Sequence, residues 1–160
     1  MLKQGDKAPE IITTTDSGEK FKLSSFKGKK VMIYFYPKDD TPGCTAEACS
    51  IRDSWSTFTK ADIPVFGISG GDEKSHQKFR NKYDIPFPLL MDEEFEIAKS
   101  YDVYKLKKMY GKEYMGIERT TFLIDEKGNI EGIFGGPEGI DKVDTKVHAD
   151  QVIQFWGLKL

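Results

Sequence analysis

Two cysteines, Cys44 and Cys49, are the residues of this chain best suited to covalent chemistry. Cys44 follows an apolar run at 31–36 that is typical of a buried strand, and it precedes a segment whose apolar residues have helical spacing. A cysteine where a strand gives way to a helix lies near unpaired N–H groups and the positive end of the helix dipole. That environment favours the thiolate, which is the form of cysteine that reacts as a nucleophile.

The spacing of the two cysteines limits how they could combine. In a continuous helix, residues at this separation have a rise of about 7.5 Å between them, and their Cα atoms lie roughly 8.5–9 Å apart. Disulfides rarely form when the Cα atoms are more than about 7 Å apart. A bond between Cys44 and Cys49 would therefore require the first turns of the helix to unwind, as a catalytic or regulatory disulfide would.

The composition bounds the class of protein. A chain of 160 residues is long enough to bury a substantial core, and we expect residues 1–160 to form one domain. The net charge of −2 gives no basic surplus that would favour nucleic acid or an anionic membrane. We see no signal peptide and no run near the ~20 apolar residues of a membrane span, which favours a cytoplasmic protein. In that compartment a close cysteine pair is more typical of a redox or metal site than of a disulfide framework.

Strands and helices alternate along the chain. We expect an N-terminal hairpin from residues 11–15 and 20–23, and core strands at 31–36 and 63–69 on either side of a cysteine helix at 45–60. Further helices are predicted at 73–83, 93–101 and 145–158, a short strand at 87–91, and a second hairpin from 119–125 and 130–134. The basic stretch 105–112 could be a loop or a weak strand, and a solvated connection is the preferred interpretation. This order predicts an α/β sandwich with a mixed central β-sheet flanked by helices.

A cysteine nucleophile also needs groups that stabilise its charge and the charge that develops on the leaving atom. Arg119 is the best candidate because it opens an apolar strand, where a guanidinium usually has a specific anionic partner. Thr41 offers a hydroxyl close before Cys44, and the ring of Pro42 can shield one side from water. The alternative is that Arg119 is an ordinary edge arginine, and only its combination with Cys44 favours the functional interpretation.

These residues match a known signature. The pattern Pro37-x-x-x-Thr41-x-x-Cys44 is the active-site signature of the peroxiredoxins, and residues 36–49 resemble the subfamily called bacterioferritin comigratory protein or peroxiredoxin Q. Segments at 67–69, 75–79, 86–90 and 119–125 also resemble that subfamily, so the similarity covers most of the chain. Gly70 and Gly71 depart from its usual pattern, and we expect them not to touch the reaction.

The resemblance implies a thioredoxin-like fold and thiol-dependent reduction of hydrogen peroxide and organic hydroperoxides. By position, Cys44 is the peroxidatic cysteine, which becomes a sulfenic acid, and Cys49 is the resolving cysteine, which condenses with it to a disulfide. Thr41 and Arg119 hold the thiolate and the peroxide oxygens. The substrate pocket is shaped by Pro37, Pro42 and Gly43. The resemblance further implies a monomer that needs no metal or organic cofactor and is recycled by thioredoxin or a similar dithiol.

Other interpretations of the same residues stay open. A zinc site could combine the two cysteines with His76 and His148, but both histidines are far away in sequence and Cys-x₄-Cys matches zinc spacing loosely. We expect His76 on a helix surface and His148 on the C-terminal helix. A thioredoxin-like oxidoreductase would need Cys-x-x-Cys, which the sequence lacks. A non-catalytic thiol redox sensor or chaperone could use the same cysteine pair.

The acidic residues around the cysteines allow two interpretations. Asp39, Asp40 and Glu47 are interpreted as loop and helix-start charges. Glu47 suits the first helical turn, where acidic residues are favourable, and it could also help to hold the active-site loop. If both cysteines were inert core thiols, the Thr-Pro-Gly approach to Cys44 would have no explanation.

Overall fold

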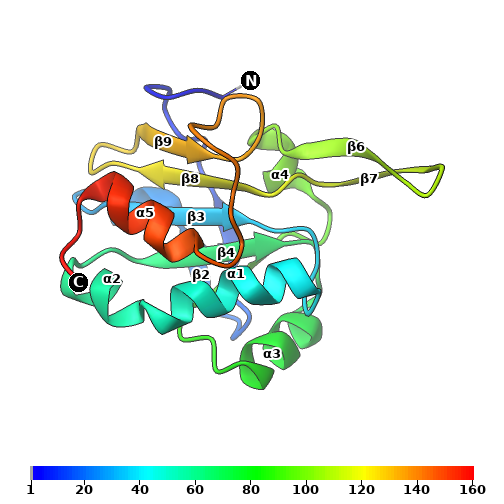
Figure 1. Cartoon of the computed structure of the whole chain (residues 1–160), viewed down its shortest axis with the longest axis horizontal. Coiled ribbons are helices and arrows are strands. Elements are labelled where there is room, and N and C mark those ends of the chain that lie inside the picture. The colour runs from blue at the N-terminus through cyan, green and yellow to red at the C-terminus, as the bar shows by residue number, and fades with distance from the viewer. Residues whose placement is uncertain (1) are drawn as a thin grey trace.

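The computed structural model, which describes residues 2–160, has a mixed five-stranded sheet with other elements on both faces (Figure 1). Across the sheet the strands are β5 (Leu89–Met91), β4 (Val65–Ser69), β3 (Val31–Phe35), β8 (Thr120–Ile124) and β9 (Ile130–Phe134). β3, β4 and β5 are parallel, whereas β8 and β9 are antiparallel to their neighbours. The predicted mixed α/β sandwich is therefore confirmed.

The two faces of the sheet carry separate apolar clusters, because successive side chains of a strand point to opposite faces. Met32 and Tyr34 of β3 pack in one cluster, whereas Ile33 and Phe35 pack in the other. The first cluster is covered by α1 (Pro42–Asp53), α2 (Trp55–Lys60), α3 (Glu73–Lys82) and α5 (His148–Trp156). The second is covered by the predicted N-terminal hairpin, β1 (Ile12–Thr14) and β2 (Lys20–Lys22), by the 3₁₀ turn η1 (Leu23–Phe26) and by α4 (Glu96–Ser100).

The cysteine helix begins earlier and ends sooner than the sequence predicts. Pro42 takes the first helical position, where its fixed φ suits the helix and its missing N–H is not needed. The helix ends at Asp53, and Ser54, at φ −110° and ψ 18°, separates it from α2. Cys44 and Cys49 thus lie on one uninterrupted helix, and both are free thiols.

The stretch interpreted as a solvated connection is instead part of a β-hairpin, so that interpretation was wrong. β6 (Tyr104–Met109) and β7 (Lys112–Ile117) pair with each other and extend away from the central sheet (Figure 1). Because both faces of this ribbon are largely exposed, its sequence lacks the alternation that would have indicated strands. Its exposed apolar residues are Leu106, Met109, Tyr110, Tyr114 and Met115.

The lengths of the helices show whether any of them could cross a membrane. Within residues 2–160, no helix combines the length and the apolar character that crossing a membrane requires.

Candidate active site

The N-terminus of α1 places Cys44 at the end of β3, where the loop 36–41 connects strand and helix. Thr41 has extended backbone at φ −100° and ψ 156°, and its carbonyl accepts the first helical hydrogen bond, from the Thr45 amide, at 2.8 Å. By helix geometry, the amides of Gly43 and Cys44 have no partner inside the helix and are free to bind an anion. The Cys44 side chain is buried, at 1% exposure, so a thiolate there needs a specific counter-charge.

Arg119 supplies that counter-charge from the neighbouring strand. The β3–β8 register pairs Phe35 with Thr120, which places Arg119 beside the end of β3. Its Nη2 atom lies 3.4 Å from Cys44 Sγ, within hydrogen-bonding reach of the sulfur. A Cβ atom on Gly43 would lie 3.0 Å from the same nitrogen, so a glycine at this position leaves room for the guanidinium. The guanidinium is therefore placed to stabilise negative charge on the Cys44 sulfur.

Glu47 holds the guanidinium from its other side. It is fully buried and lies beyond the first turn of α1, so the interpretation of Glu47 as a helix-start charge was wrong, although the idea that it holds the active-site loop agrees with its contacts. Its Oε1 atom accepts from Arg119 Nη1 at 2.7 Å. Burial raises the pKa of Glu47 to about 7, against the opposing effect of Arg119. Burial alone would lower the pKa of Arg119, but Glu47 and Cys44 raise it, so the guanidinium stays charged.

A neutral histidine lies behind this pair. His148 is fully buried at the start of α5 and lies 2.8 Å from Thr121 Oγ1 through Nε2 and 2.8 Å from Gln151 Oε1 through Nδ1. Burial lowers the pKa of His148 to about 4. Its Nε2 atom approaches Glu47 Oε2 to 3.7 Å, but because the ring is neutral this approach is not an ion pair. His148 therefore adds no positive charge here, and the Arg119 guanidinium is the cation in contact with Cys44 Sγ.

The burial of His148 predicts a pH dependence of stability. The unfolded chain protonates this histidine near pH 6.5, whereas the folded chain does so only near pH 4, so stability is lost as the pH falls through that window. Between about pH 7 and about pH 4.5, we expect the wild type to lose about 2–3 kcal/mol more unfolding free energy than His148→Gln. Urea unfolding at several pH values measures this difference. Parallel stability curves for the two proteins would show that His148 is not held neutral.

The other predicted site residues take different positions. The Thr41 hydroxyl donates to the Lys38 carbonyl at 3.0 Å, so its proton is directed at the loop and would have to turn to reach sulfur or peroxide. Pro37 lies in the loop after β3, and Pro42 opens α1. Cys49 is half-buried further along α1, and burial raises the pKa of its thiol. The structure thus brings together Cys44, Gly43 and Arg119, and leaves Cys49 on the same helix but outside this group.

A second buried polar group lies under the loop, and it corrects two expectations. His76, expected on a helix surface, is fully buried, and Asp39, expected to be a loop charge, is buried against it. The His76 Nδ1 and Asp39 Oδ2 atoms are 2.6 Å apart. Both ring nitrogens of His76 and of His148 have protein partners, which leaves neither histidine available to a zinc ion. Across residues 2–160, no three His, Cys, Asp or Glu side chains are grouped as a metal site.

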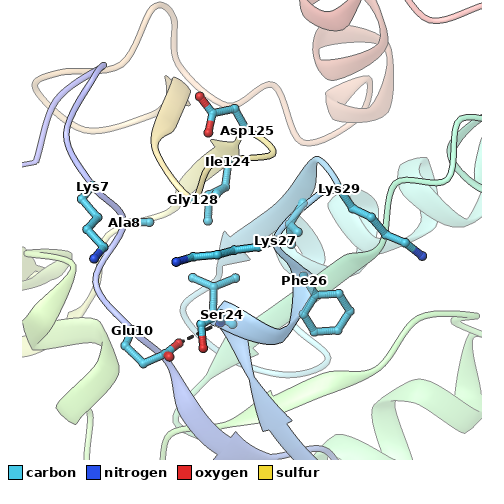
Figure 2. Close-up of a pocket in the computed structure, with 12 residues that line it drawn as sticks. Lys7, Ala8, Glu10, Ser24, Phe26, Lys27, Lys29, Ile124, Asp125 and Gly128 are labelled. Atoms are coloured by element: carbon cyan, nitrogen blue, oxygen red, sulfur yellow. Dashed lines mark hydrogen bonds between the residues drawn. The ribbon is translucent and has the colours of Figure 1, made fainter.

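A hollow of about 110 Å³ lies at the end of the sheet away from the cysteines. It is bordered by the N-terminal segment, η1 and the turn after β8, and Lys7, Lys27 and Ser24 surround it (Figure 2). Val31 and Ile124 also line it, and these residues pair at the end of β3 and β8 farthest from Arg119. The hollow is therefore separate from the cysteine site.

Comparison with known proteins agrees with this geometry. Residues 4–133 match the family described as AhpC/TSA. The chain is 52% identical over 129 residues to Peroxiredoxin Bcp of Bacillus subtilis, which covers 81% of this chain and 82% of that protein. The chain is a peroxiredoxin of the AhpC/TSA family. As a peroxiredoxin it is an enzyme, a thiol-dependent peroxidase.

Solved structures confirm the thioredoxin-like fold of this peroxiredoxin. The PrxQ of Xylella fastidiosa, solved as a cysteine-to-serine mutant, superposes with a TM-score of 0.88 at 29% identity and covers 98% of this chain and 96% of that one. The bacterioferritin comigratory protein of Xanthomonas campestris, described with alkyl peroxide reduction activity, superposes with a TM-score of 0.82 at 35% identity. That match covers 92% of this chain and 90% of the Xanthomonas chain. The predicted peroxiredoxin Q resemblance is confirmed.

Proposed function

We propose that Cys44 is the peroxidatic cysteine of this peroxiredoxin and that Arg119 activates it. The observation that carries the proposal is the 3.4 Å contact between Arg119 Nη2 and Cys44 Sγ at the N-terminus of α1. Glu47 fixes the guanidinium, because it accepts from the other terminal nitrogen at 2.7 Å. The thiolate, the cation and the free helix amides then converge on one point, where a peroxide oxygen can be bound.

The first step transfers one oxygen atom to sulfur. The Cys44 thiolate attacks the nearer oxygen of the hydroperoxide, the O–O bond breaks, and the more distant oxygen leaves with the bonding electrons. Arg119 and the amides of Gly43 and Cys44 stabilise the negative charge as it moves from sulfur to that oxygen. With one proton from solvent, the products are a sulfenic acid on Cys44 and water or an alcohol.

The second step forms the disulfide. The Cys49 thiol attacks the Cys44 sulfenic acid, the S–O bond breaks, and one water leaves with the thiol proton. Because an intact helix keeps the two Cα atoms too far apart for a disulfide, we infer that the start of α1 unwinds before the bond forms. Burial raises the pKa of Cys49, which suits a group that stays a thiol until Cys44 has been oxidised.

The third step returns both thiols. We propose that an external dithiol, thioredoxin or a protein like it, reduces the Cys44–Cys49 disulfide by thiol–disulfide exchange and is itself oxidised to a disulfide. A pair of free thiols that cycles in this way suits the reducing cytoplasm, and we propose that residues 1–160 act there as a monomeric single domain. Both hydrogen peroxide and organic hydroperoxides are proposed substrates, the latter supported by the alkyl peroxide activity of the Xanthomonas relative.

Catalytic turnover tests the whole proposal. The reduced protein, mixed with hydrogen peroxide or an organic hydroperoxide, thioredoxin, thioredoxin reductase and NADPH, should consume NADPH continuously. A thiol sensor or chaperone that peroxide oxidises but thioredoxin does not recycle would consume about one equivalent of peroxide per cysteine pair and no NADPH. That result would overturn the assignment of a turning-over peroxidase to this site.

Substitution of the resolving cysteine separates the steps. Cys49→Ser should react with peroxide once, at close to the wild-type rate, because Cys49 takes no part in the first step. Its turnover with thioredoxin should then fall by at least about tenfold, because the sulfenic acid on Cys44 has no internal partner. Rapid-quench trapping with a sulfenic acid reagent and mass spectrometry measure both results. Undiminished turnover would show that the disulfide with Cys49 is not part of the cycle.

A further inference from the structure

The loop before the cysteine helix is fixed to α3 by a buried carboxylate. The Asp39 carboxylate accepts from Tyr36 Oη at 2.6 Å and from Ser75 Oγ at 2.8 Å, and it lies 2.6 Å from His76 Nδ1. The other ring nitrogen of His76 lies 3.1 Å from the Leu90 carbonyl of β5. His76 is fully buried, so this contact lies inside the protein and joins loop, helix and sheet.

The partners of His76 hold its ring on both sides. The Leu90 carbonyl can only accept a hydrogen bond, so the Nε2 atom donates to it. Although burial opposes it, hydrogen bonding to His76 lowers the pKa of Asp39, so the Asp39 carboxylate is ionised. The contact between this carboxylate and the His76 ring is buried, and removal of the ring would leave the carboxylate without one of its hydrogen-bond partners.

The backbone next to this pair is under constraint. Asp40 has φ 57°, in the left-handed region that residues other than glycine seldom adopt. Its carboxylate accepts from Lys82 Nζ at 2.9 Å and from Tyr83 Oη at 2.7 Å, so it too is fixed to α3 and the residue after it. Gly71 lies against the pair: a Cβ atom there would come within 2.6 Å of Asp39 Oδ2 and 3.0 Å of His76 Nδ1. The glycine that departs from the subfamily pattern thus makes room for this contact.

We propose that the Asp39–His76 pair is a latch that holds the start of the cysteine helix folded and thereby sets the rate of disulfide formation. The inference rests on the proposed function, in which residues after Asp39 leave their helical positions so that the two sulfurs can meet. A latch made in the folded state and released on unwinding slows the second step and leaves the first step unchanged. It also lengthens the life of the Cys44 sulfenic acid, which a second peroxide molecule can oxidise to the sulfinic acid.

His76→Gln tests the latch most directly, because it removes the ring that contacts both Asp39 and Leu90 and keeps a hydrogen-bonding side chain. Ser75→Ala is the milder variant, because it removes one hydrogen bond to Asp39 and leaves the Asp39–His76 contact in place. Gly71→Ala perturbs the contact differently, by inserting a methyl group beside it. Asp92→Asn is the matched control: Asp92 is also a buried carboxylate, but within residues 2–160 its side-chain hydrogen bonds are to the Ile97 and Ala98 amides of α4 and not to the loop.

Rapid-quench mass spectrometry separates the two steps. In His76→Gln we expect disulfide formation to be about tenfold faster than in the wild type, which corresponds to about 1.4 kcal/mol. The peroxide concentration that converts half of Cys44 to the sulfinic acid should rise by about the same factor, and the rate of Cys44 oxidation should stay within about threefold. Ser75→Ala and Gly71→Ala should shift in the same direction by less, and Asp92→Asn should match the wild type.

Amide hydrogen exchange gives a readout that needs no peroxide. In the reduced protein, amides at 45–51 should exchange about tenfold faster in His76→Gln than in Asp92→Asn. Suppose that the wild type reacts with peroxide and forms the disulfide, but that His76→Gln has the wild-type rate of disulfide formation and the wild-type rates of amide exchange. That result would overturn the latch and leave the proposed function standing. A wild type that forms no disulfide would overturn the proposed function, and the latch with it.

Discussion

Cys44→Ser is expected to lower peroxide turnover by at least about 10⁴-fold, the order of loss seen when an enzyme nucleophile is removed. Serine keeps the size of the side chain but ionises far too weakly to attack a peroxide at neutral pH. Cys44 is the cysteine in contact with Arg119, whereas Cys49 lies elsewhere on α1. The thioredoxin-coupled NADPH assay measures the loss over its full range.

The Cys49→Ser protein is the control for this variant, because it also lacks one thiol but keeps the first step. It should consume one equivalent of peroxide, whereas Cys44→Ser should consume none. If Cys44→Ser kept most of the wild-type turnover, Cys49 or another group would be the nucleophile.

Arg119→Met is expected to slow the oxidation of Cys44 by about 10²–10³-fold, the usual effect of removing one group that stabilises developing charge. Methionine fills a similar space without the cation, so the thiolate loses its 3.4 Å partner and the leaving oxygen loses its donor. The fraction of thiolate at neutral pH, read from its ultraviolet absorbance, should fall as well. Stopped-flow oxidation of the reduced protein by peroxide measures the rate.

Arg80→Met is the matched control for Arg119→Met. The Arg80 side chain is 26% exposed and pairs with buried Asp16, whereas that of Arg119 is 22% exposed and pairs with buried Glu47. Both substitutions remove a partly buried ion pair, but only one of these arginines touches a cysteine. Equal oxidation rates and equal thiolate fractions in the two variants would show that Arg119 is only a structural edge residue.

The amino-acid sequence predicts well the elements whose side chains are buried in a regular pattern. β3 and β4 are buried along their whole length and have continuous apolar sequences, and the spacing from Pro37 to Cys44 is enough to indicate the site. The β6–β7 hairpin is not predicted because neither of its faces is covered, so its residues carry no alternation. The end of α1 is not predicted because Ser54 leaves the helical backbone conformation, and the spacing of apolar residues does not reveal such a local break.

The polar interior is harder to predict than the apolar core. Charged residues on helices usually face solvent, which is why the sequence favours surface positions for Glu47 and His76, but both are fully buried. Their burial depends on partners far away in the sequence: Arg119 is 72 residues from Glu47, and Asp39 is 37 from His76. No local pattern marks such pairs, since they exist only once β8 and α3 have packed in place.

We propose that peroxide oxidises the Cys44 thiolate and that Cys49 resolves the product within the same chain. One equivalent of hydrogen peroxide added to the reduced protein, followed by alkylation, digestion and mass spectrometry, tests this directly. We expect loss of both free thiols, a Cys44–Cys49 disulfide as the main product, and a sulfenic acid on Cys44 at the earliest times. Peroxide consumption with both thiols still open to alkylation, or a disulfide that joins two chains, would contradict it.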